Sequence, residues 1–215
     1  MTFDAVLFDF DGTVADTGKG IFAGIRYALD SLGLPPLEES VLRRFIGPPI
    51  WESFREHCGL NEDAVVQAVT KYREYYNAQG FAEMELYDGM EELLRTLSQG
   101  GVQTGVASSK PQHLVEKVAA HLGLCCDVLS GSVRDFAEDP KSAIIRRALV
   151  VLRIPADSRV LMVGDRRFDI QGAKEAGVQS AGALYGYGSR RELEEAGADY
   201  LIAAPMDLLS LVFPE

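Results

Sequence analysis

Two aspartates near the N-terminus, Asp9 and Asp11, have the spacing and setting of a reactive carboxylate pair. They directly follow an apolar run over residues 3–8, whose length and β-branched and aromatic content predict a buried strand. In a parallel α/β sheet the ligand crevice lies at the carboxyl ends of the strands. Two carboxylates there can supply a nucleophile and a general acid/base, or hold a divalent cation. A strand that ends in an Asx turn would show the same Asp-Phe-Asp, so the pair alone leaves the choice open.

The elements that must position this pair alternate between strand and helix from about residue 88 onward. The predicted strands cover residues 102–107, 128–129, 160–163, 178–184 and 200–202. The predicted helices cover residues 88–100, 111–122, 140–152, 169–176 and 190–196, followed by a C-terminal helix; Asp139 is expected to cap the third. This alternation predicts a doubly wound, mostly parallel α/β sheet.

The stretch between residues 16 and about 87 carries no strand signal. Four helical segments are predicted there, over residues 16–33, 38–45, 50–58 and 61–78. Asp16 or Thr17 is expected to cap the first segment, and Asn61 is expected to cap the last. A single strand followed by so many helical residues cannot complete a sheet, so we interpret the stretch as a helical insert that folds over the sheet.

Further polar residues follow the predicted strands or begin the following helices, and they can share the crevice with Asp9 and Asp11. These are Ser108 and Ser109, Lys141, and Asp165 with Asp169. Together they can hold and attack a phosphoryl group. Each pair of like unit charges at 4 Å would cost about 4 kcal/mol at an effective dielectric of 20, so the site needs a cation such as Mg²⁺. Lys141, Ser108 and backbone N–H groups can bind the remaining phosphoryl oxygens.

Bulk composition limits the function classes. The chain has 215 residues with a formal net charge of −11, which argues against a nucleic-acid polymer as partner. No apolar stretch is long enough to span a bilayer and no secretory signal is recognised, so a cytoplasmic protein without a membrane partner is expected. The three cysteines lack metal-ligand spacing, and the adjacent Cys125 and Cys126 are expected to be small buried residues.

The motifs, taken in order, resemble those of the haloacid dehalogenase superfamily. Residues 9–17, with the sequence DFDGTVADT, resemble its first motif, and Ser108, Lys141 and the run GDRRFD at 164–169 resemble the second, third and fourth. The resemblance spans essentially the whole chain. An insert directly after the first motif is typical of the subgroup with a four-helix cap. The resemblance therefore implies a Rossmann-like core at 1–15 and 87–215 and a helical cap at 16–86.

The resemblance also implies a mechanism and a role for each motif residue. Asp9 would attack phosphorus and form an aspartyl-phosphate, while Asp11 would protonate the leaving oxygen and then activate water. The Asp9 carboxylate, the Asp11 carbonyl and Asp165 would bind Mg²⁺. The remaining roles are support of the metal site by Asp169, and phosphate binding by Ser108, Ser109, Lys141 and the Gly12 backbone. For Lys110, which lies close to Ser108 in the sequence, a solvated side chain is favoured over a contact with the substrate.

Three stretches resemble a branch that contains phosphoglycolate phosphatases and 5′-nucleotidases: residues 45–49, the run from Gly164, and residues 185–189. The expected function is a magnesium-dependent phosphomonoester hydrolase acting on a small phosphorylated metabolite, with phosphoglycolate as the leading substrate, in a monomer or homodimer. Substrate choice is expected in the insert, at Lys19, Arg44 and Trp51. An arginine there would favour a substrate carboxylate, and Trp51 a nucleobase; a solvated helix face and packing inside the insert are the alternatives.

Two other function classes remain open at this point. A β-phosphoglucomutase-like phosphotransferase would use the same residues but protect the aspartyl-phosphate from water. A non-catalytic binding module would have no need of Asp9, Asp11, Lys141 and Asp165 together.

Overall fold

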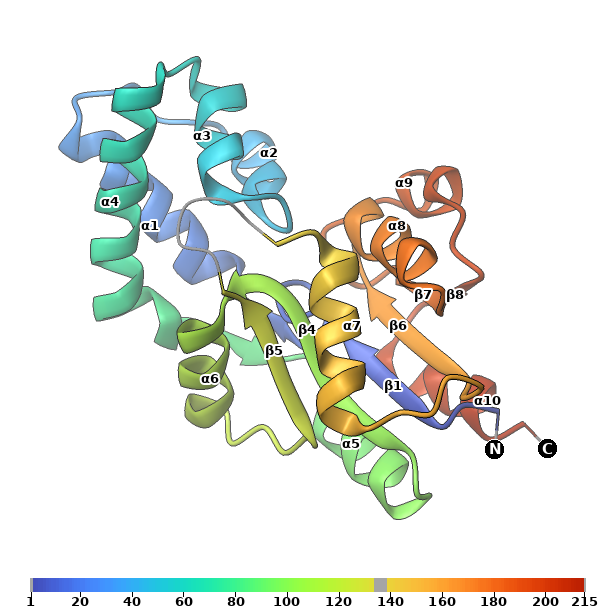
Figure 1. The fold of residues 1–215 in the computed structure, drawn as a ribbon. Coiled ribbons are helices and arrows are strands. Elements are labelled where there is room, and N and C mark those ends of the chain that lie inside the picture. The colour runs from blue at the N-terminus through green and yellow to red at the C-terminus, as the bar shows by residue number, and fades with distance from the viewer. Residues whose placement is uncertain (1, 134–138, 215) are drawn as a thin grey trace. The chain divides into compact units, whose positions relative to one another are not determined.

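The computed structural model describes residues 2–133 and 139–214 (Figure 1). The chain divides into two compact units. One comprises Met1–Ala15 and Leu86–Glu215, and is called the sheet unit below. The other comprises Asp16–Glu85, and is called the helical unit.

A six-stranded sheet organises the sheet unit, in the order β5-β4-β1-β6-β7-β8. These strands are β1 Ala5–Phe8, β4 Gln103–Pro111, β5 Val128–Ser132, β6 Val160–Gly164, β7 Gln179–Ala183 and β8 Tyr200–Ile202. Neighbouring strands pair in parallel, and Phe8 at the end of β1 lies opposite Val106 of β4 and Val163 of β6. The prediction of a mostly parallel α/β sheet is therefore confirmed. From β1 the chain adds β4 and β5 on one side and then β6, β7 and β8 on the other, so the strand order reverses next to β1. Ligands of such sheets bind at the carboxyl ends of the strands where the order reverses, and we therefore expect them at the end of β1.

Helices precede, connect or follow the strands of this unit. Those before β8 are α5 Met90–Gln99, α6 Gln112–His121, α7 Lys141–Leu152, α8 Arg167–Ala176 and α9 Arg190–Ala196, and those after β8 are η3 Pro205–Asp207 and α10 Leu208–Val212. Figure 1 shows α7 crossing in front of the strands. Alternate residues of a strand point to opposite faces. On β1, Ala5 and Leu7 pack in one buried cluster with Ile144 and Ala148 of α7 and Ala173 of α8. This packing fixes the starts of α7 and α8 relative to the strand ends.

The helical unit holds α1 Gly18–Ser31, α2 Glu39–Leu42, η1 Arg43–Phe45, α3 Ile50–Cys58, α4 Glu62–Ala78 and η2 Gly80–Ala82. The Asn61 side chain accepts a hydrogen bond from the N–H of Ala64 and so caps α4, as predicted. Thr17, one of the two predicted caps, occupies the N-cap position of α1, and the carboxylate of the other, Asp16, accepts a hydrogen bond from the N–H of Gly18 at the start of the helix (3.1 Å). In the described part of the chain, no helix is long and apolar enough to cross a membrane.

Several predicted boundaries were wrong. A two-stranded sheet pairs β2 Ala15–Asp16 with β3 Glu85–Leu86, where no strand was expected. Strand β4 does not end at residue 107 but continues to Pro111, and β5 continues to Ser132. Both extensions add polar residues, which the apolar pattern does not mark as strand. These residues are extended because β4 and β5 pair with each other, and the register of that pairing shifts between Ala107 and Pro111.

The predictions for Asp139 and for the cysteine pair were also wrong. Pro140, not Asp139, occupies the capping position of α7, because the Asp139 carboxylate is engaged elsewhere. Cys125 is exposed and Cys126 is half-buried, so the pair is not a buried apolar one. It lies in the segment between α6 and β5, where the Cys126 thiol donates to the carbonyl oxygen of Val128 in β5 (3.4 Å).

Candidate active site

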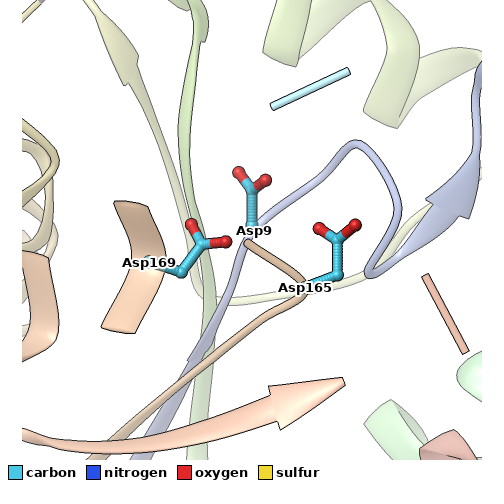
Figure 2. Close-up of side chains that lie close together, drawn as sticks. All are labelled: Asp9, Asp165 and Asp169. Atoms are coloured by element: carbon cyan, nitrogen blue, oxygen red, sulfur yellow. The ribbon is translucent and has the colours of Figure 1, made fainter. Parts of the chain in front are cut away.

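Three aspartates meet at the carboxyl ends of β1 and β6. Asp9 directly follows β1, Asp165 directly follows β6, and Asp169 lies in the first turn of α8. Each offers a carboxylate oxygen, and these oxygens lie within 4.8 Å of one another. Figure 2 shows the three side chains extending into a common space from two loops and one helix. All three residues are buried, which brings three negative charges into a region of low dielectric.

Lys141 supplies a positive charge to this cluster. It is the first residue of α7, and its Nζ lies 2.7 Å from Oδ1 of Asp9 and 2.7 Å from Oδ1 of Asp169. Burial alone would lower the pKa of Lys141, but the charges of Asp169 and Asp9 outweigh it and raise the pKa above its usual range. Lys141 therefore stays protonated and bridges the nucleophile candidate to the start of α8.

One lysine does not balance the charge of three carboxylates. Burial raises the pKa of Asp165 well above its usual range, and the charges of Asp169 and Asp9 raise it further. Burial likewise raises the pKa of Asp169, although Lys141 opposes this shift. These directions indicate uncompensated negative charge, and the donors are carboxylate oxygens, which are the ligands that Mg²⁺ prefers. The residues present therefore fit a divalent cation.

A loop after β7 holds the Asp165 carboxylate in place. Its Oδ2 accepts a hydrogen bond from the N–H of Tyr187 (2.8 Å), and its Oδ1 accepts from the Thr13 hydroxyl (3.3 Å). Two glycines make the approach possible. A Cβ added at Gly188 would lie 1.8 Å from the carbonyl oxygen of Asp165. A Cβ added at Gly186 would lie 2.4 Å from the Cβ of Asp165. The loop at residues 185–189, which the sequence marked only by its resemblance to the family, therefore contacts Asp165 closely. Glycine is required at both positions because a side chain would collide with Asp165.

Gly12 has a further steric requirement. Its φ is +80°, and a Cβ there would lie 2.3 Å from Oδ2 of Asp165. Its N–H donates to the carbonyl oxygen of Ala15 (2.9 Å) and closes the turn after Asp11. The contact of the Gly12 backbone with phosphate stays a prediction.

Asp11 pairs with a residue that the sequence analysis assigned to solvent. Nζ of Lys110 lies 3.1 Å from Oδ2 of Asp11, and the Lys110 side chain is only 6% exposed. The interpretation of Lys110 as a solvated lysine was therefore wrong. The signal that could have revealed it is its position two residues after Ser108, which places both on the same side of an extended strand.

The two serines lie on β4, the neighbour of β1. Ser108 is buried, and its hydroxyl oxygen accepts a long hydrogen bond from the N–H of Lys110 (3.4 Å). Ser109 is half-buried. Since Val106 lies opposite Phe8, Ser108 is brought to the end of the sheet at which Asp9 leaves β1. Phosphate binding by either serine stays a prediction.

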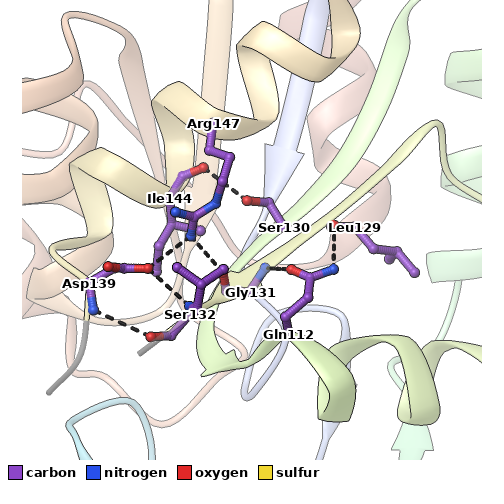
Figure 3. A network of polar contacts seen from close by, with 9 residues as sticks. Gln112, Leu129, Ser130, Gly131, Ser132, Asp139, Ile144 and Arg147 are labelled. Carbon is purple, nitrogen blue, oxygen red and sulfur yellow. Dashed lines mark hydrogen bonds and ion pairs between the residues drawn. The ribbon is translucent and has the colours of Figure 1, made fainter. Parts of the chain in front are cut away.

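A polar network ties the end of β5 to α7 (Figure 3). Arg147 on α7 donates to the carbonyl oxygen of Gly131 (2.6 Å) and pairs with Oδ2 of Asp139 (3.0 Å). The N–H of Asp139 donates to the Ser132 hydroxyl (3.3 Å). These contacts fix the residues just before α7, and thereby the position of Lys141.

The predicted specificity residues lie in the helical unit. Lys19 on α1 and Arg44 in η1 are exposed, and Trp51 on α3 is half-buried. The guanidinium carbon of Arg55 lies 4.9 Å from the centroid of the Trp51 ring. Nε1 of Trp51 is buried and has no hydrogen-bond partner among the described residues. Their role in substrate choice stays a prediction.

Comparison with known proteins identifies the family. A family model for haloacid dehalogenase-like hydrolases matches residues 6–183. The chain belongs to the haloacid dehalogenase-like hydrolase family. The resemblance drawn from the motifs at Asp9, Ser108, Lys141 and Gly164–Asp169 is thereby confirmed.

Curated relatives of this chain differ in their named activities. Tyrosine-protein kinase PtkA of Mycobacterium tuberculosis is 36% identical over 185 residues, which cover 85% of this chain but only 62% of PtkA. A 5′-nucleotidase of Pseudomonas aeruginosa is 35% identical over 195 residues, 90% of this chain and 88% of that protein. A phosphoglycolate phosphatase of Vibrio parahaemolyticus is 27% identical over 218 residues, 96% of this chain and 95% of that protein.

A solved structure aligns with this chain over its full length. The crystal structure of a predicted phosphatase from Clostridium acetobutylicum superposes with a TM-score of 0.92 at 34% identity, covering 100% of both chains. The phosphatases among these relatives and structures support the prediction that this haloacid dehalogenase-like hydrolase is a phosphatase enzyme.

Proposed function

We propose that the protein is a magnesium-dependent phosphomonoester hydrolase that works through an aspartyl-phosphate. The observation that carries this proposal is the buried cluster in which Lys141 bridges Asp9 and Asp169 beside Asp165. A structural ion pair would need one carboxylate for one lysine. Here three carboxylates surround one lysine, and the pKa values of two of them, Asp165 and Asp169, are raised. Such a cluster suits a site that binds a cation together with a phosphoryl group.

In the proposed first half-reaction, a carboxylate oxygen of Asp9 attacks phosphorus while the bond to the ester oxygen breaks. Asp11 gives its proton to that departing oxygen, and the alcohol leaves. In the second half-reaction Asp11, now ionised, takes a proton from water as the water attacks phosphorus. The bond to Asp9 then breaks and inorganic phosphate is released.

The remaining residues hold these groups in position. Lys141 keeps Asp9 oriented through its Oδ1 and offsets negative charge, and Ser108 and Ser109 are proposed to bind phosphoryl oxygens. Asp9, Asp165 and the backbone carbonyl of Asp11 would hold Mg²⁺, with Asp169 supporting the site through its contact with Lys141. When bound, Mg²⁺ supplies positive charge that polarises the phosphoryl group and offsets the repulsion between anions.

We propose that residues 1–15 and 87–215 act as the hydrolase core and residues 16–86 as a cap that selects the substrate, a small phosphorylated metabolite. Phosphoglycolate stays the leading candidate, with Arg44 as the proposed partner of its carboxylate. The 5′-nucleotidase among the relatives supports nucleoside monophosphates as the second candidate, with Trp51 as the proposed stacking residue. The net charge of −11 supports a cytoplasmic enzyme that does not bind nucleic-acid polymers.

Phosphate release tests this proposal. The panel comprises 2-phosphoglycolate, nucleoside monophosphates, sugar phosphates and p-nitrophenyl phosphate, each with Mg²⁺ and with EDTA. We expect Mg²⁺-dependent release that Asp9→Asn abolishes while the circular dichroism spectrum is unchanged. Substantial release by metal-saturated Asp9→Asn would refute Asp9 as nucleophile. Isomerisation of a sugar phosphate without net release would instead support a phosphotransferase, and no turnover at all would support a binding module.

A further inference from the structure

Lys110 is a buried lysine that the proposed chemistry has not yet used. Its side chain is 6% exposed, although lysine is rarely buried unless it is paired. Its Nζ lies 3.1 Å from Oδ2 of Asp11, the carboxylate assigned to proton transfer. The two residues come from the turn after β1 and from the end of β4, so only the fold brings them together.

The backbone of β4 directs Lys110 toward this carboxylate. The register of β4 against β5 shifts between Ala107 and Pro111. Such irregularities re-aim side chains at the end of a strand. Within the shifted segment, the N–H of Lys110 donates to the hydroxyl oxygen of Ser108 (3.4 Å). Ser108 and Lys110 are thus set by the same short piece of backbone.

The two oxygens of Asp11 have different surroundings. Oδ2 contacts Lys110, whereas Oδ1 is buried and accepts no hydrogen bond from any described residue. Leaving a carboxylate oxygen buried without a donor is unfavourable, so such an atom calls for an explanation in the function. An oxygen that must carry a proton to the substrate cannot be committed to a permanent donor. Contact of the other oxygen with Lys110 restrains the carboxylate, while no donor among the described residues competes for Oδ1.

We propose that Lys110 is a positioning residue for Asp11, holding Oδ2 so that Oδ1 delivers the proton to the departing ester oxygen. This inference rests on the proposed phosphatase function and adds a residue to it. Lys110 does not itself exchange a proton with the substrate. Its contribution is therefore largest for leaving groups that need protonation, and small for leaving groups that depart as stable anions.

The experiment compares two kinds of monoester in Lys110→Met. The first is p-nitrophenyl phosphate, whose leaving group departs without protonation, and the second is the alkyl phosphate of the substrate panel that the wild type hydrolyses fastest. The value of kcat/KM reports the step in which the ester bond breaks. We expect it to fall about 100-fold for the alkyl phosphate, and by no more than about threefold for p-nitrophenyl phosphate. Lys110→Arg, which keeps the charge, should recover part of the alkyl phosphate rate.

A double-mutant cycle tests whether Lys110 acts through Asp11. In an Asp11→Asn background, Lys110→Met should change kcat/KM for either ester by no more than about twofold, because the group that it positions is already lost. Lys174→Met, at an exposed site on α8, is the matched control and should behave as wild type. Thermal unfolding of each variant confirms that the comparison is made on folded protein.

The outcomes separate this inference from the proposed function. No phosphate release by the wild type from any ester would overturn the proposed function and the inference with it. Normal wild-type release with an equal loss for both esters in Lys110→Met would overturn the inference alone. A loss that persists in full in the Asp11→Asn background would show direct contact with the substrate, and would also overturn it.

Discussion

Replacing Lys141 by Met should strongly destabilise the metal-free protein. The ammonium group of Lys141 lies 2.7 Å from carboxylate oxygens of both Asp9 and Asp169, and its side chain is only 6% exposed. Methionine is unbranched and similar in length, so the change removes the charge without opening a large cavity. Two buried carboxylates would then lose their shared cation while Asp165 stays close by.

The expected magnitude follows from this burial. Breaking a buried ion pair by removing one partner costs about 3–5 kcal/mol of unfolding free energy. In a chain of 215 residues, each kcal/mol lowers Tm by about 2–4 °C. We therefore expect the Tm of Lys141→Met to lie about 6–20 °C below that of the wild type.

Thermal unfolding followed by circular dichroism at pH 7.5 in EDTA is the assay. Lys174→Met provides the matched control, because Lys174 is exposed on α8, and it should change the unfolding free energy by no more than about 0.5 kcal/mol. Adding Mg²⁺ should raise the Tm of Lys141→Met, since a cation bound only by the folded state stabilises it. A Tm for Lys141→Met equal to that of Lys174→Met in EDTA would refute the reasoning, because the carboxylates would then carry no charge that needs Lys141.

Three further predictions concern the support of the site and the surface. Gly188→Ala should weaken Mg²⁺ binding about 10–100-fold by calorimetric titration, because its Cβ would lie 1.8 Å from the carbonyl oxygen of Asp165. Gly177→Ala places its Cβ where nothing lies within 4 Å but at a φ of +81°, so it should lower stability slightly and leave Mg²⁺ affinity unchanged; equal losses of affinity in both variants would contradict this reasoning. Asp165→Asn should lose Mg²⁺ binding yet keep its circular dichroism spectrum; unchanged affinity would remove Asp165 from the metal site. Burial raises the pKa of the Cys126 thiol to about 11, so at pH 8 only about one molecule in 1,000 carries its thiolate. Reaction of single-cysteine variants with a disulfide reagent should therefore be much slower at Cys126 than at the exposed Cys125, and should accelerate about tenfold per pH unit up to pH 10; equal rates would contradict it.

Elements with a strong apolar period could be predicted from the sequence, while polar strand ends could not. Helix α3 was predicted over its observed residues 50–58, because proline at 49 and glycine at 59 mark its ends, and β8 was predicted over 200–202, because that short run is apolar. Strand β4 was predicted to end at residue 107 because its last four residues are polar, or proline, at 108–111. Its true length follows from pairing with β5, which local propensity does not report.

The sequence by itself determined the family, the α/β class and the chemical identity of the reactive groups. Asp9, Lys141 and Asp165 follow strands or begin helices, and this position predicts a common crevice whatever the details of packing. The tertiary structure decided how the charges are shared. Lys141 bridges two aspartates, and Lys110 binds Asp11 instead of facing solvent. The pairs Lys141–Asp9 and Lys110–Asp11 join residues 132 and 99 positions apart along the chain, and only the assembled sheet and its covering helices fix such distances.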